Sequence, residues 1–211
     1  MTILGDKLLA LHRALDDHGI PHAIGGAIAL AYAVNQARAT HDIDINVFVR
    51  PDQADRVLQA LPAGVRVRPT DLDVLRRDGQ ARLWWDDTPV DLFLSTVELH
   101  DVAAGRTRSV PFEEGSLPIL SPTDLAVCKA MYGRTKDWAD IEAMRDAATV
   151  DAADALRWVA GMLTPEHPNY QRLNEILSSP PTSDEGDRLP EAMRPARGLR
   201  ARPGPPRPGA C

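Results

Sequence analysis

Cysteine and long apolar runs are scarce in this chain, and each scarcity excludes a class of protein. Only two cysteines occur among 211 residues, Cys128 and Cys211, and neither lies in a Cys-x-x-Cys or Cys/His spacing. We therefore expect neither a zinc site nor a disulfide framework. No apolar stretch approaches the roughly 20 residues that a membrane-spanning helix needs. Because a basic segment leading into an apolar one is also lacking at the N-terminus, we predict a cytoplasmic protein without a membrane partner.

An excess of positive charge is lacking as well. The chain carries 24 Lys and Arg against 30 Asp and Glu, for a formal net charge of −6. Such a chain has no electrostatic footprint for tight non-specific binding to DNA, so we expect no DNA partner, although a local basic patch can still contact RNA. Hydrophobic residues make up 44% of the sequence, which is enough to bury a core.

The apolar spacing and the turn residues predict a mixed set of elements. Helices are predicted at about 8–15, 27–34, 55–61, 121–134, 135–148, 151–163 and 169–177. Strands are predicted at about 22–24, 42–49, 65–68, 81–85, 90–94, 108–112 and 117–120, with a hairpin turn at 86–89. The first part thus mixes strands and helices and the second is helical, which indicates the α+β class.

Three regions follow from this pattern. Residues 1–120 are predicted to form a mixed sheet core with flanking helices. At Ser121 the chain turns helical, with an N-cap serine followed by Pro122 and Asp124, and residues 121–177 are predicted to pack on the core as a helical region. Residues 178–211 are rich in Pro and Arg without apolar periodicity, and we predict a disordered tail there.

Two aspartates one residue apart are the most informative feature of the sequence. Asp42 and Asp44 open an apolar strand, and the period of two in a strand places both carboxylates on one face. Ile43 and Ile45 then face the other side, which can be buried. Two converging carboxylates need a cation, and Mg²⁺ takes carboxylate oxygens while it keeps positions for water and phosphate. The pair therefore predicts a magnesium site.

A third acid and a glycine pair complete the pattern. Asp91 interrupts a strand that otherwise reads as buried, and a lone buried carboxylate is costly. If this strand lies beside the first, Asp91 joins Asp42 and Asp44 as a metal ligand, and two Mg²⁺ ions can act there. Asp91 is also the candidate base for an attacking hydroxyl. Gly25 and Gly26 precede a helix, whose N-terminal N–H groups favour phosphate.

The segments Gly25-Gly26-Ala27-Ile28 and Arg38-Ala39-Thr40-His41-Asp42-Ile43-Asp44 resemble the signature of the polymerase-β-type nucleotidyltransferase superfamily. Together with Lys129, Arg134 and Lys136-Asp137 they are most similar to the AbiEii-like nucleotidyltransferase toxins. The resemblance covers about residues 20–146. It implies a nucleotidyltransferase-like fold, an NTP such as ATP as substrate, and Arg38, Thr40 and Lys129 as nucleotide-binding residues beside the glycines. It also implies a cognate antitoxin as a partner.

The predicted function is Mg²⁺-dependent transfer of an NMP from an NTP to a hydroxyl acceptor. The acceptor class is left open among RNA, with tRNA as one candidate, protein and small molecules. A toxin of a toxin–antitoxin pair, an antibiotic-modifying enzyme and an RNA-tailing enzyme all fit. The alternative from another class is a catalytically silent nucleotidyltransferase-like domain that binds nucleotide or a protein partner.

Structural roles compete for several of these residues. Lys129 can instead extend its charge to solvent along an apolar face, Arg38 can pair locally, and the two glycines can serve only as a tight turn. Asp137 and Asp140 are expected to pair with charged neighbours along their helix. The candidate partners are Arg134, Lys136 and Arg145. Three of the four tryptophans are expected to pack in the core or a lid, with stacking on a base as the alternative; these three are Trp84, Trp85 and Trp138.

Overall fold

The computed structural model describes residues 3–113 and 115–182. The chain up to Pro181 forms one compact unit. Of the predicted tail, only residues 178–182 belong to the described part; the remainder of that prediction lies outside it.

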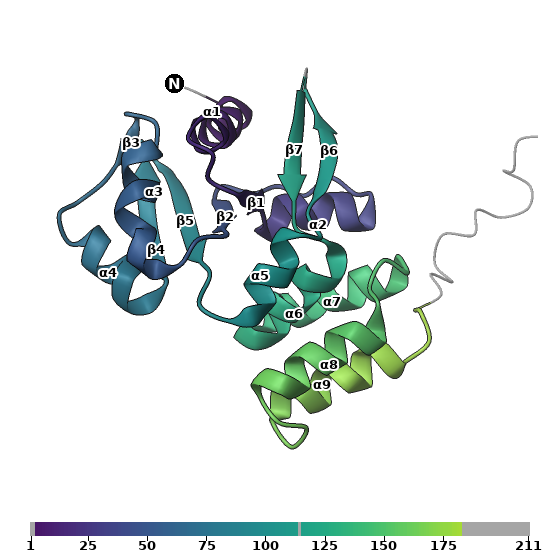
Figure 1. Cartoon of the computed structure of the whole chain (residues 1–211). Coiled ribbons are helices and arrows are strands. Elements are labelled where there is room, and N and C mark those ends of the chain that lie inside the picture. Colours follow the sequence, from purple (N-terminus) through teal and green to yellow (C-terminus); the bar gives the residue numbers. More distant parts are fainter. Residues whose placement is uncertain (1–2, 114, 183–211) are drawn as a thin grey trace, which may run out of the picture. The chain divides into compact units, whose positions relative to one another are not determined.

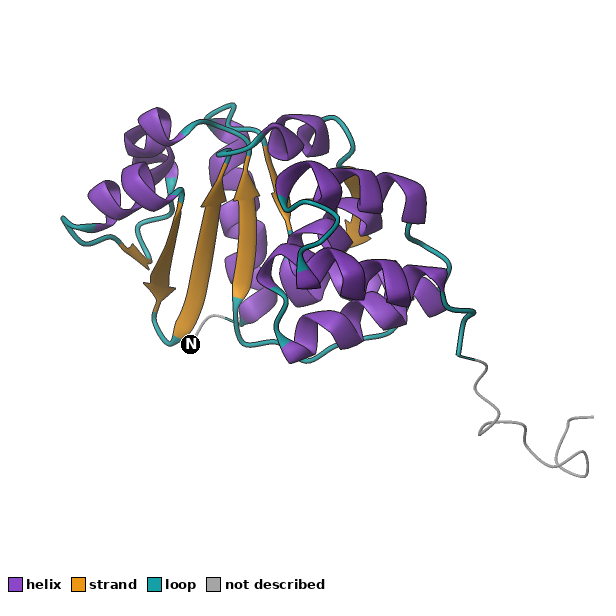
Figure 2. Ribbon diagram, turned by 90° about the horizontal axis from the view of Figure 1, so that it is seen from below, coloured by secondary structure: helices purple, strands orange, loops and turns teal. Residues whose placement is uncertain are grey.

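Seven strands of the described residues form one mixed sheet in the order β3-β4-β5-β2-β1-β7-β6. Their bounds are His22–Ile24 (β1), Ile43–Val47 (β2), Val65–Arg66 (β3), Gln80–Trp85 (β4), Thr88–Leu94 (β5), Arg108–Phe112 (β6) and Gly115–Ile119 (β7). Strand β2 is central, since it pairs antiparallel with β1 and parallel with β5. Figure 2 shows these strands with helices around them.

Helices precede, interrupt and follow the strands (Figure 1). The helices before β6 are α1 (Leu4–Asp17), α2 (Gly26–Val34), α3 (Ala54–Ala60), α4 (Asp71–Asp78) and α5 (Glu98–Ala104), with a 3₁₀ turn at Pro51–Gln53. Those after β7 are α6 (Pro122–Tyr132), α7 (Thr135–Asp146), α8 (Ala152–Met162) and α9 (Pro168–Ser178). Helix α6 joins the two sets, because it packs against α2 as well as against α7, α8 and α9.

The predicted α+β architecture is confirmed: a mixed sheet with flanking helices is followed by a C-terminal helical region. The predicted cap at Ser121 is confirmed too, since its hydroxyl accepts a hydrogen bond from the backbone N–H of Asp124 at 3.1 Å. Helices α4 and α5 were not predicted. A signal for α4 was present, because Gly79 ends it in the left-handed conformation at φ +68°.

The β4–β5 hairpin is tighter than predicted. Thr88 and Pro89 belong to β5 and not to the turn, which leaves Asp86 and Asp87 as the connection. Trp85 consequently pairs with Thr88. This register matters for the site, since it determines which residue of β4 lies opposite Asp91.

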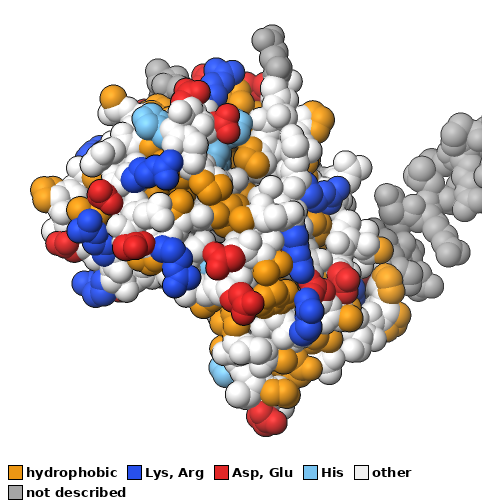
Figure 3. Space-filling view, in the orientation of Figure 1, with side chains coloured by type: hydrophobic (Ala, Val, Ile, Leu, Met, Phe, Trp, Pro, Cys, Tyr) orange, Lys and Arg blue, Asp and Glu red, His pale blue; other side chains and the backbone are white. Residues whose placement is uncertain are grey.

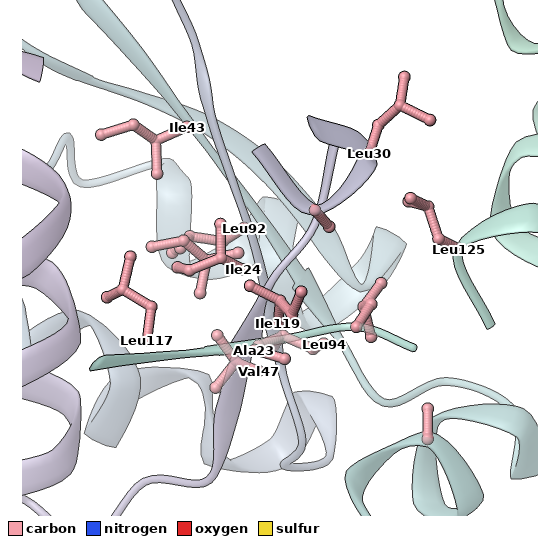
Figure 4. Close-up of a cluster of buried hydrophobic side chains, with 14 of the residues drawn as sticks. Ala23, Ile24, Leu30, Ile43, Val47, Leu92, Leu94, Leu117, Ile119 and Leu125 are labelled. Carbon is pink, nitrogen blue, oxygen red and sulfur yellow. The ribbon is translucent and has the colours of Figure 1, made fainter. Parts of the chain in front are cut away.

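The core lies between the sheet and its helices and is made from distant parts of the chain. Figure 4 shows side chains of β1, β2, β5, β7, α2 and α6 meeting in one cluster. The labelled residues are Ala23, Ile24, Leu30, Ile43, Val47, Leu92, Leu94, Leu117, Ile119 and Leu125. Because Ile43 and Val47 are fully buried in this cluster, β2 cannot slip by one residue without exposing them, and the register of its polar face is fixed as well.

The surface gives no sign of a dominant charge on the face shown in Figure 3. Lys and Arg are interspersed there with Asp and Glu. Among the helices of residues 3–113 and 115–182, none is long and apolar enough to cross a membrane.

Candidate active site

The three predicted carboxylates come from two neighbouring strands. Strands β2 and β5 run parallel, and Asp44 and Asp91 are direct Cα partners in their register. Asp42 immediately precedes β2 and shares the face of Asp44 by the period of two. The condition stated for Asp91, that its strand lies beside the strand of Asp44, is therefore met.

A hydroxyl holds Asp42 in position. Thr40 Oγ1 donates a hydrogen bond to Asp42 Oδ1 at 2.6 Å, and the backbone N–H of Asp42 donates to Thr40 Oγ1 at 3.4 Å. Thr40 thus orients the carboxylate through a short local loop. This contact gives Thr40 a positioning role at the acid pair, next to the nucleotide-binding role that the sequence predicts.

The negative charge of the Asp44 carboxylate is only partly balanced by the positive charges around it. Burial, followed by the neighbouring charges of Asp42 and Asp91, raises its pKa from the usual 3.8 to about 6, while Lys129 and Lys136 act in the opposite direction. In the described part of the chain no hydrogen bond or ion pair reaches its carboxylate. A carboxylate in this state is stabilised by an added cation.

Asp91 has a partner that the sequence did not predict. Arg82 Nε and Nη2 donate to Asp91 Oδ1 and Oδ2 at 2.7 and 2.6 Å, so both carboxylate oxygens are engaged. Arg82 is the cross-strand Cα partner of Asp91 in the β4–β5 hairpin. Asp91 raises the pKa of Arg82 through this pair. The sequence did contain a signal for this pair. A two-residue turn at Asp86–Asp87 sets the hairpin register that places Arg82 opposite Asp91.

The glycine pair lets the start of α2 approach these acids. Gly25 is the N-cap, and its backbone N–H donates to the carbonyl oxygen of Asp44 at 2.9 Å. Gly26 adopts φ +54°, and a Cβ on it would overlap Asp44 Oδ2. A Cβ at Gly25 would come 2.7 Å from Asn46 Nδ2. Glycine is therefore required here for close approach and for backbone conformation, which goes beyond the simple tight-turn reading.

Lys129 is largely buried and paired, so the alternative of a lysine that extends into solvent is wrong. Its Nζ lies 2.7 Å from Asp140 Oδ2 and 3.7 Å from Asp137 Oδ1. Arg38 contacts the other oxygen of Asp140 at 3.3 Å. A single carboxylate of α7 thus bridges Lys129 on α6 and Arg38 on the loop before β2.

The predicted pairing along α7 holds for Asp137 and not for Asp140. Asp137 pairs with Arg134, whose Nε and Nη2 lie 2.6 and 3.1 Å from the carboxylate. Asp140 instead pairs with Lys129 on α6 and with Arg38 on the loop before β2, two cations that lie farther from it in the sequence than its helix neighbours.

These groups open on one cleft of about 1090 Å³. All the predicted site residues except Gly25 line it: Gly26, Arg38, Thr40, Asp42, Asp44, Asp91 and Lys129. Further lining residues that the sequence analysis missed include Asn46, Arg82, Phe93 and Tyr132.

Tyr132 is the exposed aromatic side chain of this cleft. The guanidinium of Arg134 lies 4.9 Å from the centre of its ring, and its hydroxyl donates to Gln80 Oε1 at 2.9 Å. The predicted stacking candidates Trp84, Trp85 and Trp138 do not belong to its lining. Trp138 instead donates its Nε1–H to the carbonyl oxygen of Gly133, in a packing role.

The carboxylates suit a hard divalent cation chemically, since they offer oxygen donors and excess negative charge. Among residues 3–113 and 115–182, no three or more His, Cys, Asp or Glu side chains form a group that could hold a metal ion. At this site Arg82 binds both oxygens of Asp91. Asp42 and Asp44 have no cationic partner among the described residues, so their oxygens are the donors available to a cation, whereas Asp91 offers none unless Arg82 moves.

No family model and no curated protein matches this sequence. Solved structures with similarity include two of the antibiotic-resistance factor ANT(2'')-Ia. The solution structure has 14% identity over 81% of this chain and 89% of that one, with a TM-score of 0.45. The crystal structure in complex with adenylyl-2''-tobramycin has 15% identity over 83% and 97%, with a TM-score of 0.46.

A third similar structure is an antigenic nucleotidyltransferase-like protein from Paracoccidioides brasiliensis. It has 15% identity over 81% of this chain and 93% of that one, with a TM-score of 0.41. All of these TM-scores lie below 0.5.

Proposed function

We propose that this protein is a Mg²⁺-dependent nucleotidyltransferase that moves an NMP from an NTP to a hydroxyl acceptor and releases pyrophosphate. The observation that supports it most directly is the register of β2 and β5. That register makes Asp44 and Asp91 direct partners, with Asp42 on the same face. The glycine turn at the start of α2 touches the same carboxylate of Asp44. Acids for a metal and N–H groups for a phosphate therefore meet at one place.

In this proposal Asp42 and Asp44 hold Mg²⁺ and Asp91 completes the set. The ions would neutralise phosphate charge and polarise the phosphoryl oxygens. The oxygen of the acceptor hydroxyl would attack the α-phosphorus, and Asp91 would accept the proton of that hydroxyl. The bond between the α-phosphorus and the pyrophosphate breaks as the new bond forms. The protein otherwise contributes positioning and charge, since phosphoryl transfer asks for little covalent chemistry from it.

The cations of the cleft suit the nucleotide. Lys129 and Arg38 share Asp140 in the structure, so one carboxylate holds two potential phosphate ligands near the acids. Lys129 also lowers the pKa of Asp44, which places its charge within reach of the site. In the proposed complex the triphosphate takes over part of the role of Asp140, since phosphate oxygens are strong acceptors for such donors.

The acceptor class stays open within this proposal. The cleft mixes both signs of charge: the acids Asp137 and Asp140 lie near the cations Arg134 and Lys136. A purely acidic wall would favour a cationic drug, and a basic groove would favour tRNA. An AbiEii-like toxin role further predicts a cognate antitoxin that binds the chain and blocks transfer.

Incubation with NTPs labelled at the α-phosphorus tests the proposal. The acceptors are total cellular RNA, the protein itself and a panel of aminoglycosides, each with Mg²⁺. We expect one acceptor to become labelled while pyrophosphate is released. With NTPs labelled at the γ-phosphorus instead, no acceptor should become labelled. The matched control is Asp44→Asn. Label transfer of equal extent by Asp44→Asn, or transfer from the γ-position, contradicts the proposal.

A catalytically silent nucleotide-binding domain is the second candidate, and the Arg82–Asp91 pair favours it, since the third acid is occupied in the structure. This reading predicts Mg²⁺-dependent NTP binding by calorimetry without pyrophosphate release for any acceptor of the panel. Release of pyrophosphate that depends on both Asp44 and an acceptor excludes it.

A further inference from the structure

The three carboxylates differ in how their negative charge is balanced. Asp42 accepts a hydrogen bond from the neutral hydroxyl of Thr40. Asp91, which is only 13% exposed, has both oxygens bound to the guanidinium of Arg82. For the Asp44 carboxylate no such contact occurs within the described residues. A cation that enters the cleft thus meets two carboxylates without a direct cationic partner and one that is already neutralised.

The hairpin determines where Arg82 lies. Because the turn consists of Asp86 and Asp87 alone, Arg82 and Asp91 become Cα partners. Side chains of such partners project to the same face of the sheet. The guanidinium therefore lies on the same face as the acids, and Asp42 and Asp44 add to the negative potential around it.

A guanidinium and a divalent cation compete for the same two oxygens. An arginine in a protein keeps its proton at all ordinary pH values, so the pair with Asp91 opens only when Arg82 swings away. Arg82 is free to do so, since its side chain is 53% exposed and extends toward the cleft. A half-exposed ion pair of this kind contributes little to folding, and its position at the third acid points to a role in the site.

We propose that Arg82 is a positioning residue that holds Asp91 in place until a divalent cation takes its oxygens, and that this competition sets the divalent-ion concentration at which the three-acid site forms. The inference rests on the proposed function, because it assumes that the acids hold such a cation. Beyond that function, Arg82 is a residue that weakens the binding of a divalent cation when no substrate is present.

Calorimetric titration of the full chain with Mn²⁺, without nucleotide and after removal of metals, tests this inference. Arg82→Met removes the competing charge and keeps a flexible apolar stem. It should bind Mn²⁺ about fivefold more tightly than the unmodified protein, the factor that corresponds to a half-exposed ion pair. Arg82→Lys keeps the charge without the planar fork and should fall between the two.

Arg77→Met is the matched control. Arg77 makes the same two-bond contact with Asp78 on α4, at 2.8 and 2.6 Å. The variant therefore removes the same charge and the same geometry outside the acid set, and its Mn²⁺ affinity should equal that of the unmodified protein.

The outcomes separate this inference from the proposed function. If Arg82→Met binds Mn²⁺ no more tightly than Arg77→Met while Asp44→Asn abolishes binding, the inference is overturned and the metal site stands. If neither the unmodified protein nor Arg82→Met binds Mn²⁺, both are overturned. Circular dichroism confirms folding, and if Arg82→Met does not fold, the affinity of Arg82→Lys decides in the same way.

Discussion

The backbone of Gly26 passes so close to the carboxylate of Asp44 that any side chain at position 26 would overlap Oδ2. This contact joins the start of α2 to the centre of the acid set. It explains why both features of the sequence pattern, the glycine pair and the alternating aspartates, are needed for one site. Glycine at this position serves the approach and also the positive φ of +54°.

Gly26→Ala should therefore destabilise the fold. We expect a loss of about 1–3 kcal/mol in the free energy of unfolding, because the substitution combines a left-handed backbone with a steric overlap. Urea denaturation measures it. Gly161→Ala is the matched control, since nothing lies within 4 Å of a Cβ there. In helix α8 that change should stabilise by about 0.5–1 kcal/mol. Equal stability of Gly26→Ala and the unmodified protein would contradict the contact.

Asp44→Asn should lower transfer at least about a hundredfold, because it removes charge where the transition state needs a cation. The fold should persist, since the amide has the same shape. Label transfer measured with the acceptor found above tests this, and Asp17→Asn on the exposed end of α1 serves as the control. Substantial turnover by a folded Asp44→Asn protein would exclude Asp44 from the metal site.

The stability of the metal-free protein should depend on pH through Asp44. Its folded pKa of about 6 lies above the usual 3.8, so between these values the folded state binds more protons than the unfolded state. The free energy of unfolding therefore falls as the pH rises through this window. The full penalty above pH 6 amounts to about 3 kcal/mol at most.

Asp44→Asn removes this group and isolates its effect from that of other carboxylates. Urea denaturation in a chelating buffer at pH 4.5 and pH 7 compares the two proteins. The stability of Asp44→Asn relative to the unmodified protein should be greater at pH 7. A difference that is the same at both pH values would show that the Asp44 carboxylate is adequately compensated without metal.

Lys129→Met tests the lysine that bridges α6 to Asp140. The free energy of unfolding should fall by only about 1 kcal/mol, since Arg38 still pairs with Asp140 and Arg134 with Asp137. If the ammonium meets the triphosphate, the affinity for NTP should weaken by about 1–3 kcal/mol, the range for a charge-assisted hydrogen bond. Calorimetry with a non-hydrolysable NTP in Mg²⁺ measures it.

Asp140→Asn is the variant with the opposite expectation. It leaves Lys129 and Arg38 in place and removes the carboxylate that competes with phosphate for both. NTP affinity should then stay equal or increase. If neither variant alters NTP affinity, Lys129 is a structural partner of Asp140 and does not belong to the nucleotide site.

The sequence indicated where the acids lie because its signals are local or periodic. Alternation places Asp44 and the preceding Asp42 on one face and the buried isoleucines of β2 on the other. An acid in an otherwise apolar strand marked Asp91 as anomalous, and the parallel pairing of β2 with β5 places it beside Asp44. The cap at Ser121 was predicted for the same reason, since its hydrogen bond spans three residues.

The sequence did not predict the partners of three cations. Four residues assigned to the turn instead of two hid the pairing of Arg82 with Asp91. Helix spacing suggested near neighbours for Asp140, yet its partners are Lys129 on α6 and Arg38 on the loop before β2. Long charged side chains reach several candidates, so their pairing depends on distances between elements that no local pattern contains.

The sequence by itself determined the α+β class, the strand that carries Asp44 directly after Asp42, and the glycines that begin α2, because hydrophobic periodicity and backbone conformation are properties of short segments. Only the tertiary structure decided how these acids are compensated. Arg82 neutralises Asp91 across a hairpin, and burial together with the like charges around it leaves Asp44 with a raised pKa. Electrostatic balance in a site is set by the distances between folded elements, and those distances exist only once the chain has packed.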